Sequence, residues 1–243
     1  MSRMSIRAGT AFALSGAMLL AACGGKAAPR PDNEVPSAEF PAAHRPVSPI
    51  VSSRWSTEEA RDRLNEADRV MDLAGIEPGM TVADIGAGEG YYTIRLAERV
   101  GPKGRVLAQD VVAAVRNALA DRVYRERLDN VSVKLGAPAD PKLPPGSFDR
   151  ILMVHMYHEI EAPYEFLWRL RPSLKPRGRV VIVDADRATA NHGTPPALLA
   201  CELAAVGYKL TEAKLLPQQG TYLRVFEPVG KRPEPRAITV CKG

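Results

Sequence analysis

The chain has 243 residues, of which 45% are hydrophobic and 25% are charged, as in an ordinary globular protein. This composition excludes a wholly disordered chain, and the length is sufficient to bury a substantial core. The formal net charge of +5 is small, and lysines and arginines form no block interleaved with aromatic residues. We therefore expect no nucleic-acid partner.

The first 22 residues have the features of a secretory signal peptide. Arg3 and Arg7 precede the uncharged run "AGTAFALSGAMLL", which is too short to span a bilayer. The run leads into "LLAACGG", which resembles a bacterial lipobox. The resemblance implies cleavage of residues 1–22, lipidation of Cys23 and a lipid-anchored protein in a bacterial cell envelope, facing the periplasm. Two alternatives stay open: a plain secretory signal with an incidental cysteine, and a cytoplasmic protein whose leader is not processed.

Prolines gather near both ends of the remaining chain. Residues 23–50 are rich in proline and alanine and show no periodicity, which predicts a tether. We expect one folded domain over 51–230 and a C-terminal tail over 231–243. Once Cys23 takes the lipid, Cys201 and Cys241 remain as a pair. They form either a disulfide, as an oxidising compartment permits, or two unpaired thiols.

A helix opens the predicted domain. Ser56 is the expected N-cap, and Glu59 stands three residues later in the spacing of a capping box. Gly75 ends the helix. Its apolar stripe consists of Leu64, Ala67, Val70, Met71 and Ala74.

From residue 81 the chain alternates between strands and helices. The predicted strands are "TVADIG", "RVLAQDV", "NVSVKLG", "FDRILMVHM" and "GRVVIVDAD". The predicted helices are "YYTIRLAERVG", residues 112–128, "APYEFLWRLRPSL" and "TPPALLACELAAVG". This alternation predicts an α/β fold with a doubly wound, mostly parallel sheet. The last two strands, "YKLTEAKLLP" and "TYLRVFEPV", have no helix between them and are expected to form an antiparallel hairpin at one edge.

The stretch "DIGAGEG" predicts a glycine turn between the first strand and its helix. Gly86, Gly88 and Gly90 are spaced two apart. A dinucleotide fingerprint needs glycine at position 91, which is Tyr91, so the spacing argues against a pyrophosphate site. The glycines still permit a ligand to approach the backbone, and the following helix offers N–H groups to a carboxylate.

Asp110 ends the next predicted strand, 20 residues after Gly90. This is the usual distance for a carboxylate that binds ribose hydroxyls. The turn and the acid together suit a ligand with a ribose, an adenine and a carboxylate but no phosphate. S-adenosylmethionine (SAM) has this composition.

Several segments together resemble class I SAM-dependent methyltransferases. "VADIGAGEG" is similar to their first motif, and Asp110 matches their ribose-binding acid. "LPPGSFDRILMVHMYHEI" resembles the fourth-strand motif, and "LKPRGRVVIVDADR" resembles the fifth-strand segment, with Arg177 in place of a usual glycine. The resemblance covers roughly residues 56–229. It implies a Rossmann-like sheet of seven strands with an antiparallel last strand, and SAM as the cofactor.

The resemblance also indicates which residues contact SAM. Many members of this family carry an acid after the third strand that faces the adenine amine, but here that position is Ala137. Asp140 is the candidate replacement from a shifted loop. The expected cofactor-binding residues are Asp84, Gly86, Ala87, Gly88, Gly90, Tyr91, Asp110, Val111 and Asp140.

The end of the fourth strand, "HMYHEI", is where acceptor-binding residues are expected in an open α/β sheet. Our candidate catalytic residues are His155, Tyr157, His158 and Glu159. A general base is needed only where the acceptor must lose a proton. The alternative is structural, with His155 bonded to a backbone carbonyl and Glu159 starting a helix.

A metal site formed by His155, His158 and Glu159, with Asp184 or Asp186 from the next strand, is a further alternative. The spacing matches no known ligand motif such as H-E-x-x-H, so we predict no metal.

The sequence thus predicts a SAM-dependent methyltransferase that acts on a small molecule or an envelope component and is attached to the membrane through its lipid. The alternative is a non-catalytic envelope lipoprotein that binds an adenosyl group or another small ligand. The sequence indicates neither the methyl acceptor nor the oligomeric state.

Overall fold

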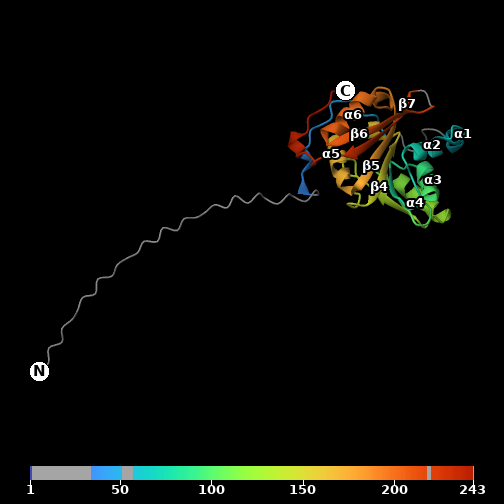
Figure 1. The fold of residues 1–243 in the computed structure, drawn as a ribbon, viewed down its shortest axis with the longest axis horizontal. Helices are drawn as coiled ribbons and strands as arrows, with labels where there is room; N and C mark the ends of the chain where they lie inside the picture. Colours follow the sequence, from blue (N-terminus) through green and yellow to red (C-terminus); the bar gives the residue numbers. More distant parts are fainter. Residues whose placement is uncertain (2–33, 51–56, 218–219, 243) are drawn as a thin grey trace. The chain divides into compact units, whose positions relative to one another are not determined.

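The computed structural model describes Met1 and residues 34–50, 57–217 and 220–242 (Figure 1). Nearly all of the predicted signal peptide, Cys23, the start of the tether and the predicted N-cap Ser56 lie outside the described residues. The residues from Val35 onward form one compact unit.

Seven strands form a single sheet in the order β3-β2-β1-β4-β5-β7-β6. The strands β1 to β5 are parallel, and β7 pairs antiparallel with both β5 and β6. This arrangement confirms the predicted fold and the closing hairpin. The strands are β1 (Thr81–Ile85), β2 (Arg105–Asp110), β3 (Val131–Leu135), β4 (Phe148–Val154), β5 (Leu174–Ala185), β6 (Tyr208–Leu215) and β7 (Thr221–Pro228).

Helices cover both faces of the sheet (Figure 1). Side chains alternate along β5: Val180 and Ile182 pack with α5 and α6, whereas Val181 and Val183 pack on the face of α2 and α3. None of the described helices is both long and apolar enough to cross a membrane. The helices are α1 (Glu58–Arg63), α2 (Glu66–Leu73), α3 (Tyr91–Val100), α4 (Ala113–Arg125), α5 (Pro163–Leu170) and α6 (Pro196–Ala205).

The predicted first helix is two helices. Thr57 caps α1 by accepting from the N–H of Ala60, and Asn65, at φ 50°, interrupts the chain before α2. Asparagine tolerates this left-handed conformation better than most residues. The break leaves Leu64 half exposed, so only the later part of the predicted stripe is buried. It also turns Glu66 inward, where its carboxylate accepts from Arg61.

The segments predicted as a tether and as a tail both pack against the predicted domain. The domain therefore extends further at both ends than predicted. Val35 and Ile238 belong to the same buried core as α5 and α6. Residues 35–50 are therefore not a tether, and the segment predicted as a tail is part of the fold. His44 forms a bridge with Lys242, and Cys241 is joined to Cys201 by a disulfide, which resolves the alternative left open above.

Candidate functional site

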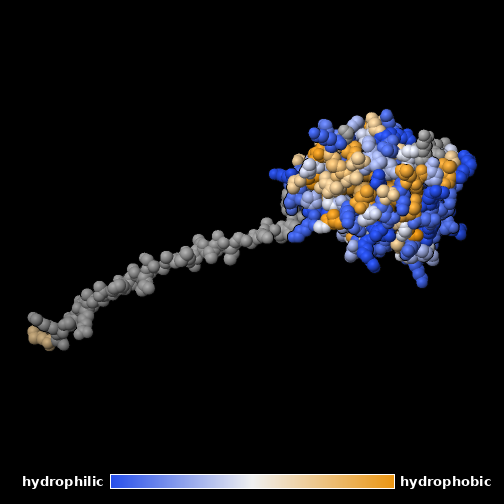
Figure 2. Space-filling view, turned by 45° about the horizontal axis from the view of Figure 1, so that its top comes forward, coloured by the Kyte–Doolittle hydropathy of each residue, from blue (hydrophilic) through white to orange (hydrophobic). Residues whose placement is uncertain are grey.

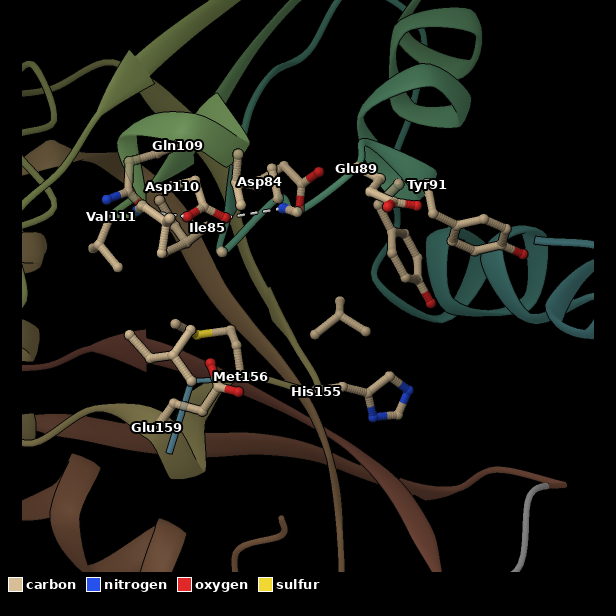
Figure 3. A pocket seen from close by; sticks show the side chains of 18 of the residues that line it. Asp84, Ile85, Glu89, Tyr91, Gln109, Asp110, Val111, His155, Met156 and Glu159 are labelled. Atoms are coloured by element: carbon tan, nitrogen blue, oxygen red, sulfur yellow. Dashed lines mark hydrogen bonds between the residues drawn. The ribbon is translucent and has the colours of Figure 1, made fainter. Parts of the chain in front are cut away.

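A cleft opens at the carboxyl ends of β1, β2 and β4 (Figure 3). The topology brings these strands side by side, because the chain reverses its direction of winding between β1 and β4. Of the predicted cofactor-binding residues, the cleft is lined by Asp84, Gly86, Ala87, Gly88, Tyr91, Asp110 and Val111.

The glycine turn follows β1 in a conformation that side chains resist. Gly86, Gly88 and Gly90 have φ angles of 66°, 55° and 93°. A Cβ on Gly86 would lie 2.9 Å from Met156 Cγ, and one on Gly90 would lie 2.5 Å from Leu119 Cδ1. A Cβ on Gly88 would meet nothing within 4 Å, so the missing side chain keeps that position open. Neighbouring side chains therefore leave no room for a Cβ at the two ends of the turn, Gly86 and Gly90, whereas its centre at Gly88 is open.

Asp110 ends β2 with its carboxylate held by two backbone groups. Oδ2 accepts from the N–H of Gly88 at 3.1 Å, and Oδ1 accepts from the N–H of Val112 at 2.8 Å (Figure 3). The residue is buried but lines the cleft. A carboxylate accepts about four hydrogen bonds, so Asp110 keeps acceptor capacity for a ligand.

Asp84 lies beneath the same turn and is almost completely buried. Its Oδ2 accepts from the Thr93 hydroxyl at 2.6 Å, which joins the end of β1 to α3. Burial raises the pKa of Asp84 to about 6, against the lowering effect of the Thr93 hydrogen bond. The Asp110 charge raises the pKa of Asp84 further.

The side of the cleft near α1 is built around Tyr91. The guanidinium groups of Arg61 and Arg95 each lie 3.9 Å from the centre of the Tyr91 ring. The Tyr91 hydroxyl donates to Asp62 Oδ1 at 2.9 Å. These contacts hold α1 against the start of α3, and Glu58 and Arg61 of α1 line the cleft.

Two candidate catalytic residues, His155 and Glu159, line the cleft. They follow β4, and their side chains point in different directions (Figure 3). His155 follows β4 at φ 56°, and its Nε2 lies 3.5 Å from Glu66 Oε1. Burial alone raises the pKa of Glu66, but hydrogen bonds with His155 and Arg61 outweigh it and lower the pKa to about 2. The ionised Glu66 therefore holds the His155 ring, whereas Glu159 ends a short 3-10 helix.

Tyr157 points into the core, which corrects its prediction as an active-site residue. It is fully buried, and its hydroxyl donates to Glu202 Oε2 at 2.7 Å. Glu202 Oε1 also accepts from Arg45 Nε at 2.8 Å in a buried ion pair. Burial raises the pKa of Tyr157 well above its ordinary value. Tyr157 therefore serves to position the turn that carries Glu159.

His158 is also buried and does not line the cleft. Its Nδ1 lies 2.9 Å from Asp184 Oδ1, and Asp184 Oδ2 accepts from the Thr194 hydroxyl at 2.8 Å. His158 itself therefore does not contact the cleft, whereas the next residue, Glu159, lines it.

Gly90 and Asp140 are likewise outside the cleft lining. Gly90 forms the N-cap of α3, and the Asp140 carboxylate accepts from the N–H of Lys142. The loop after β3 instead contributes Pro138. Asp140 is thus not brought to the position that the resemblance suggested.

Other lining residues escaped the sequence analysis. Gln109 and Val112 flank the Asp110 region, and their proximity to that acid was the available signal. Met156 and Glu58 carried none, because an apolar residue and a helix-surface acid are common everywhere.

The family model described as methyltransferase domain matches residues 76–227, more than half of the chain. The chain belongs to this methyltransferase family. The match spans the strands, the glycine turn and the cleft described above.

The methyltransferase is 36% identical to nocamycin O-methyltransferase of Saccharothrix syringae over 117 residues. The aligned region covers 47% of this chain and 41% of that protein. It is 28% identical over 123 residues to the ubiquinone/menaquinone biosynthesis C-methyltransferase UbiE of Hahella chejuensis, covering 49% of this chain and 48% of that one. The chain thus spans about half the length, or less, of these curated relatives.

Solved structures show the same architecture. A SAM-dependent methyltransferase from Aquifex aeolicus aligns with a TM-score of 0.65 and 27% identity, over 70% of this chain and 93% of that one. The [4+2]-cyclase SpnF aligns with a TM-score of 0.61 at 16% identity, over 80% of this chain and 90% of that one. The second likeness shows the fold alone.

Proposed function

We propose that this methyltransferase transfers a methyl group from SAM to a small molecule or an envelope component. The observation that carries the proposal is the Asp110 carboxylate, oriented by the amides of Gly88 and Val112 at the floor of the cleft. A carboxylate with two oxygens fixed in this way suits the two neighbouring hydroxyls of a ribose.

The remaining cofactor-side residues fit the other parts of SAM. Val111, Val112 and Pro138 offer apolar surface to a flat base. The glycine turn admits a ligand close to its backbone, since Gly88 has open space where a side chain would lie. Bound SAM supplies an activated methyl group, so the task of the protein is mainly to orient the acceptor.

His155 and Glu159 are the candidate catalytic residues on the acceptor side. The Glu66 carboxylate, 3.5 Å from His155 Nε2, holds the His155 ring in one orientation. Either side chain can accept a proton where the acceptor is a hydroxyl or an amine.

We also propose that the protein is anchored through a lipid on Cys23 and faces the periplasm. The lipobox resemblance motivates the anchor, and the Cys201–Cys241 disulfide supports the periplasmic location, because disulfides persist mainly in oxidising compartments. Intact-mass measurement of the native protein tests the anchor. Cleavage before Cys23 with acylation supports it, and a full-length, unmodified chain overturns it in favour of the cytoplasmic alternative.

Calorimetric titration of SAM into a chain beginning at Val35 tests the cofactor assignment. We expect saturable binding that weakens about 100-fold in Asp110→Ala, because two hydrogen bonds to a charged group are lost. Asp121→Ala is the matched control, since Asp121 is an exposed acid on α4 outside the cleft. Absence of SAM binding to the folded wild-type chain would favour the non-catalytic binding protein. Equal loss of SAM affinity in both variants would show that Asp110 does not bind the ribose.

A further inference from the structure

Three potential metal ligands meet beside the acceptor side of the cleft. His158, Glu159 and His192 each offer a ligand atom, and these atoms lie within 4.8 Å of one another. His158 and Glu159 belong to the short helix after β4, and His192 follows the 3-10 helix Thr189–Asn191 after β5. His155, a candidate ligand from the sequence, is directed toward Glu66 instead.

The His158 ring is held by a buried acid. Asp184 has no exposed surface and bonds to His158 Nδ1, which leaves Nε2 as the ring nitrogen for a metal. Asp184 is itself fixed by the Thr194 hydroxyl and by the N–H of Ala185. A carboxylate behind a histidine in this way is the usual support of a metal-binding imidazole.

His192 is held by the N-terminal segment. Its backbone N–H donates to the hydroxyl oxygen of Ser48 at 3.0 Å, and the Ser48 hydroxyl donates to the carbonyl of Thr189. Ser48 is buried. The rings of His158 and His192 lie edge to face with their centres 5.5 Å apart. Residues from three distant segments thus converge on one point.

We propose that His158, Glu159 and His192 bind a divalent transition-metal ion. Two imidazole nitrogens and one carboxylate form a ligand set suited to zinc or iron(II). Zinc bonds to these ligands are about 2.0–2.2 Å long, so the three groups need to close by a shift on the order of 1 Å. Three protein ligands leave a coordination position for another molecule, as catalytic metal sites do.

Glu159 links this site to the cleft, because it lines the cleft while belonging to the ligand group. If the proposed function holds, the open position receives the methyl acceptor through an oxygen or sulfur atom. The inferred acceptor class is therefore a molecule with a metal-binding hydroxyl or thiol.

Cobalt(II) titration of the purified full-length chain, without SAM, tests the site, with the visible absorption of the bound ion as the readout. We expect about one equivalent of tightly bound cobalt that zinc displaces. His192→Ala and Glu159→Gln should each weaken cobalt binding at least tenfold, and Asp184→Asn, which changes a positioning residue, about 10–100-fold. His44→Ala is the control and should bind cobalt as the wild type does, since His44 is an exposed histidine outside the group.

Circular dichroism of each variant establishes that it is folded. Cobalt binding that is absent from the wild type, or that persists in both His192→Ala and Glu159→Gln, overturns the metal site. Loss of cobalt binding in His44→Ala to the same extent also overturns it. Because the cobalt readout needs no SAM, failure of the metal site and failure of the proposed function are observed separately.

Discussion

The two sides of the cleft are constructed differently. The cofactor half, formed by residues 84–91 and 109–112, relies on two backbone N–H groups, one in the glycine turn and one after β2, that orient the Asp110 carboxylate. The acceptor half, formed by residues 154–160, relies on side chains held by buried partners from elsewhere, such as Glu202 and Asp184. The cofactor half should therefore be sensitive to backbone conformation, and the acceptor half to the loss of buried charge.

The largest expected effect is in the acceptor half. Glu202→Gln should lower the free energy of unfolding by about 3–5 kcal/mol, because Arg45 would remain charged and buried without its ionic partner. Urea denaturation measures this loss. In the control, Glu212→Gln, the pair with Arg179 is more than one-third exposed, and the loss should stay below about 1 kcal/mol. Similar losses in both variants would show that burial does not determine how much an ion pair contributes to stability here.

The cofactor half also contains a buried acid, Asp84, but here the charged form lowers stability. The pKa of Asp84 is raised from 3.8 to about 6, so its contribution to stability is present below pH 3.8 and is lost as the pH rises through about 6. The whole loss is about 3 kcal/mol, of which about 2 kcal/mol falls above pH 4.5. Asp84→Asn should remove this fall, as measured by urea denaturation from pH 4.5 to 7.

Glu66 does not confound that measurement. Its pKa of about 2 lies below its ordinary value of 4.5, so the stability it contributes is lost only as the pH falls below 4.5. If wild type and Asp84→Asn showed parallel stability curves from pH 4.5 to 7, the buried acid would not be the cause.

Backbone sensitivity in the cofactor half can be separated from ordinary glycine effects. Gly79 and Gly90 have similar φ angles of 86° and 93°, but only Gly90 would place a Cβ against a neighbour, Leu119. Alanine at either position should cost about 1–2 kcal/mol for the left-handed conformation. Gly90→Ala should cost about 1–3 kcal/mol more from overpacking. Equal thermal stabilities would show that Leu119 moves away.

The smallest expected effect is at the border with α1. Tyr91→Phe removes the hydrogen bond to Asp62 but keeps the ring between Arg61 and Arg95. We expect a loss of about 0.5–1.5 kcal/mol by urea denaturation. Tyr124→Phe, at a position 85% exposed, is the control and should change nothing measurable. A larger loss in Tyr91→Phe would mean that Asp62 positions the whole helix.

Much of the acceptor half lay beyond sequence reasoning. "HMYHEI" marked the correct strand end, but Tyr157 and Glu159 have opposite environments although they are two residues apart. Their directions depend on the short helix and on Glu202, which is 45 positions away from Tyr157. His192 joined no predicted group, because nothing near it in the sequence suggests His158 as a neighbour.

The sequence by itself determined the sheet, the closing hairpin, the glycine turn and Asp110. These features rest on local causes: hydrophobic periodicity, glycine conformations and an acid at the end of a strand. Only the tertiary structure decided that residues 35–50 and 231–242 belong to the fold, that Cys201 meets Cys241, and that Arg45 pairs with Glu202. These contacts join segments far apart in the chain, and their partners are selected by the packing of the finished core rather than by spacing along the chain.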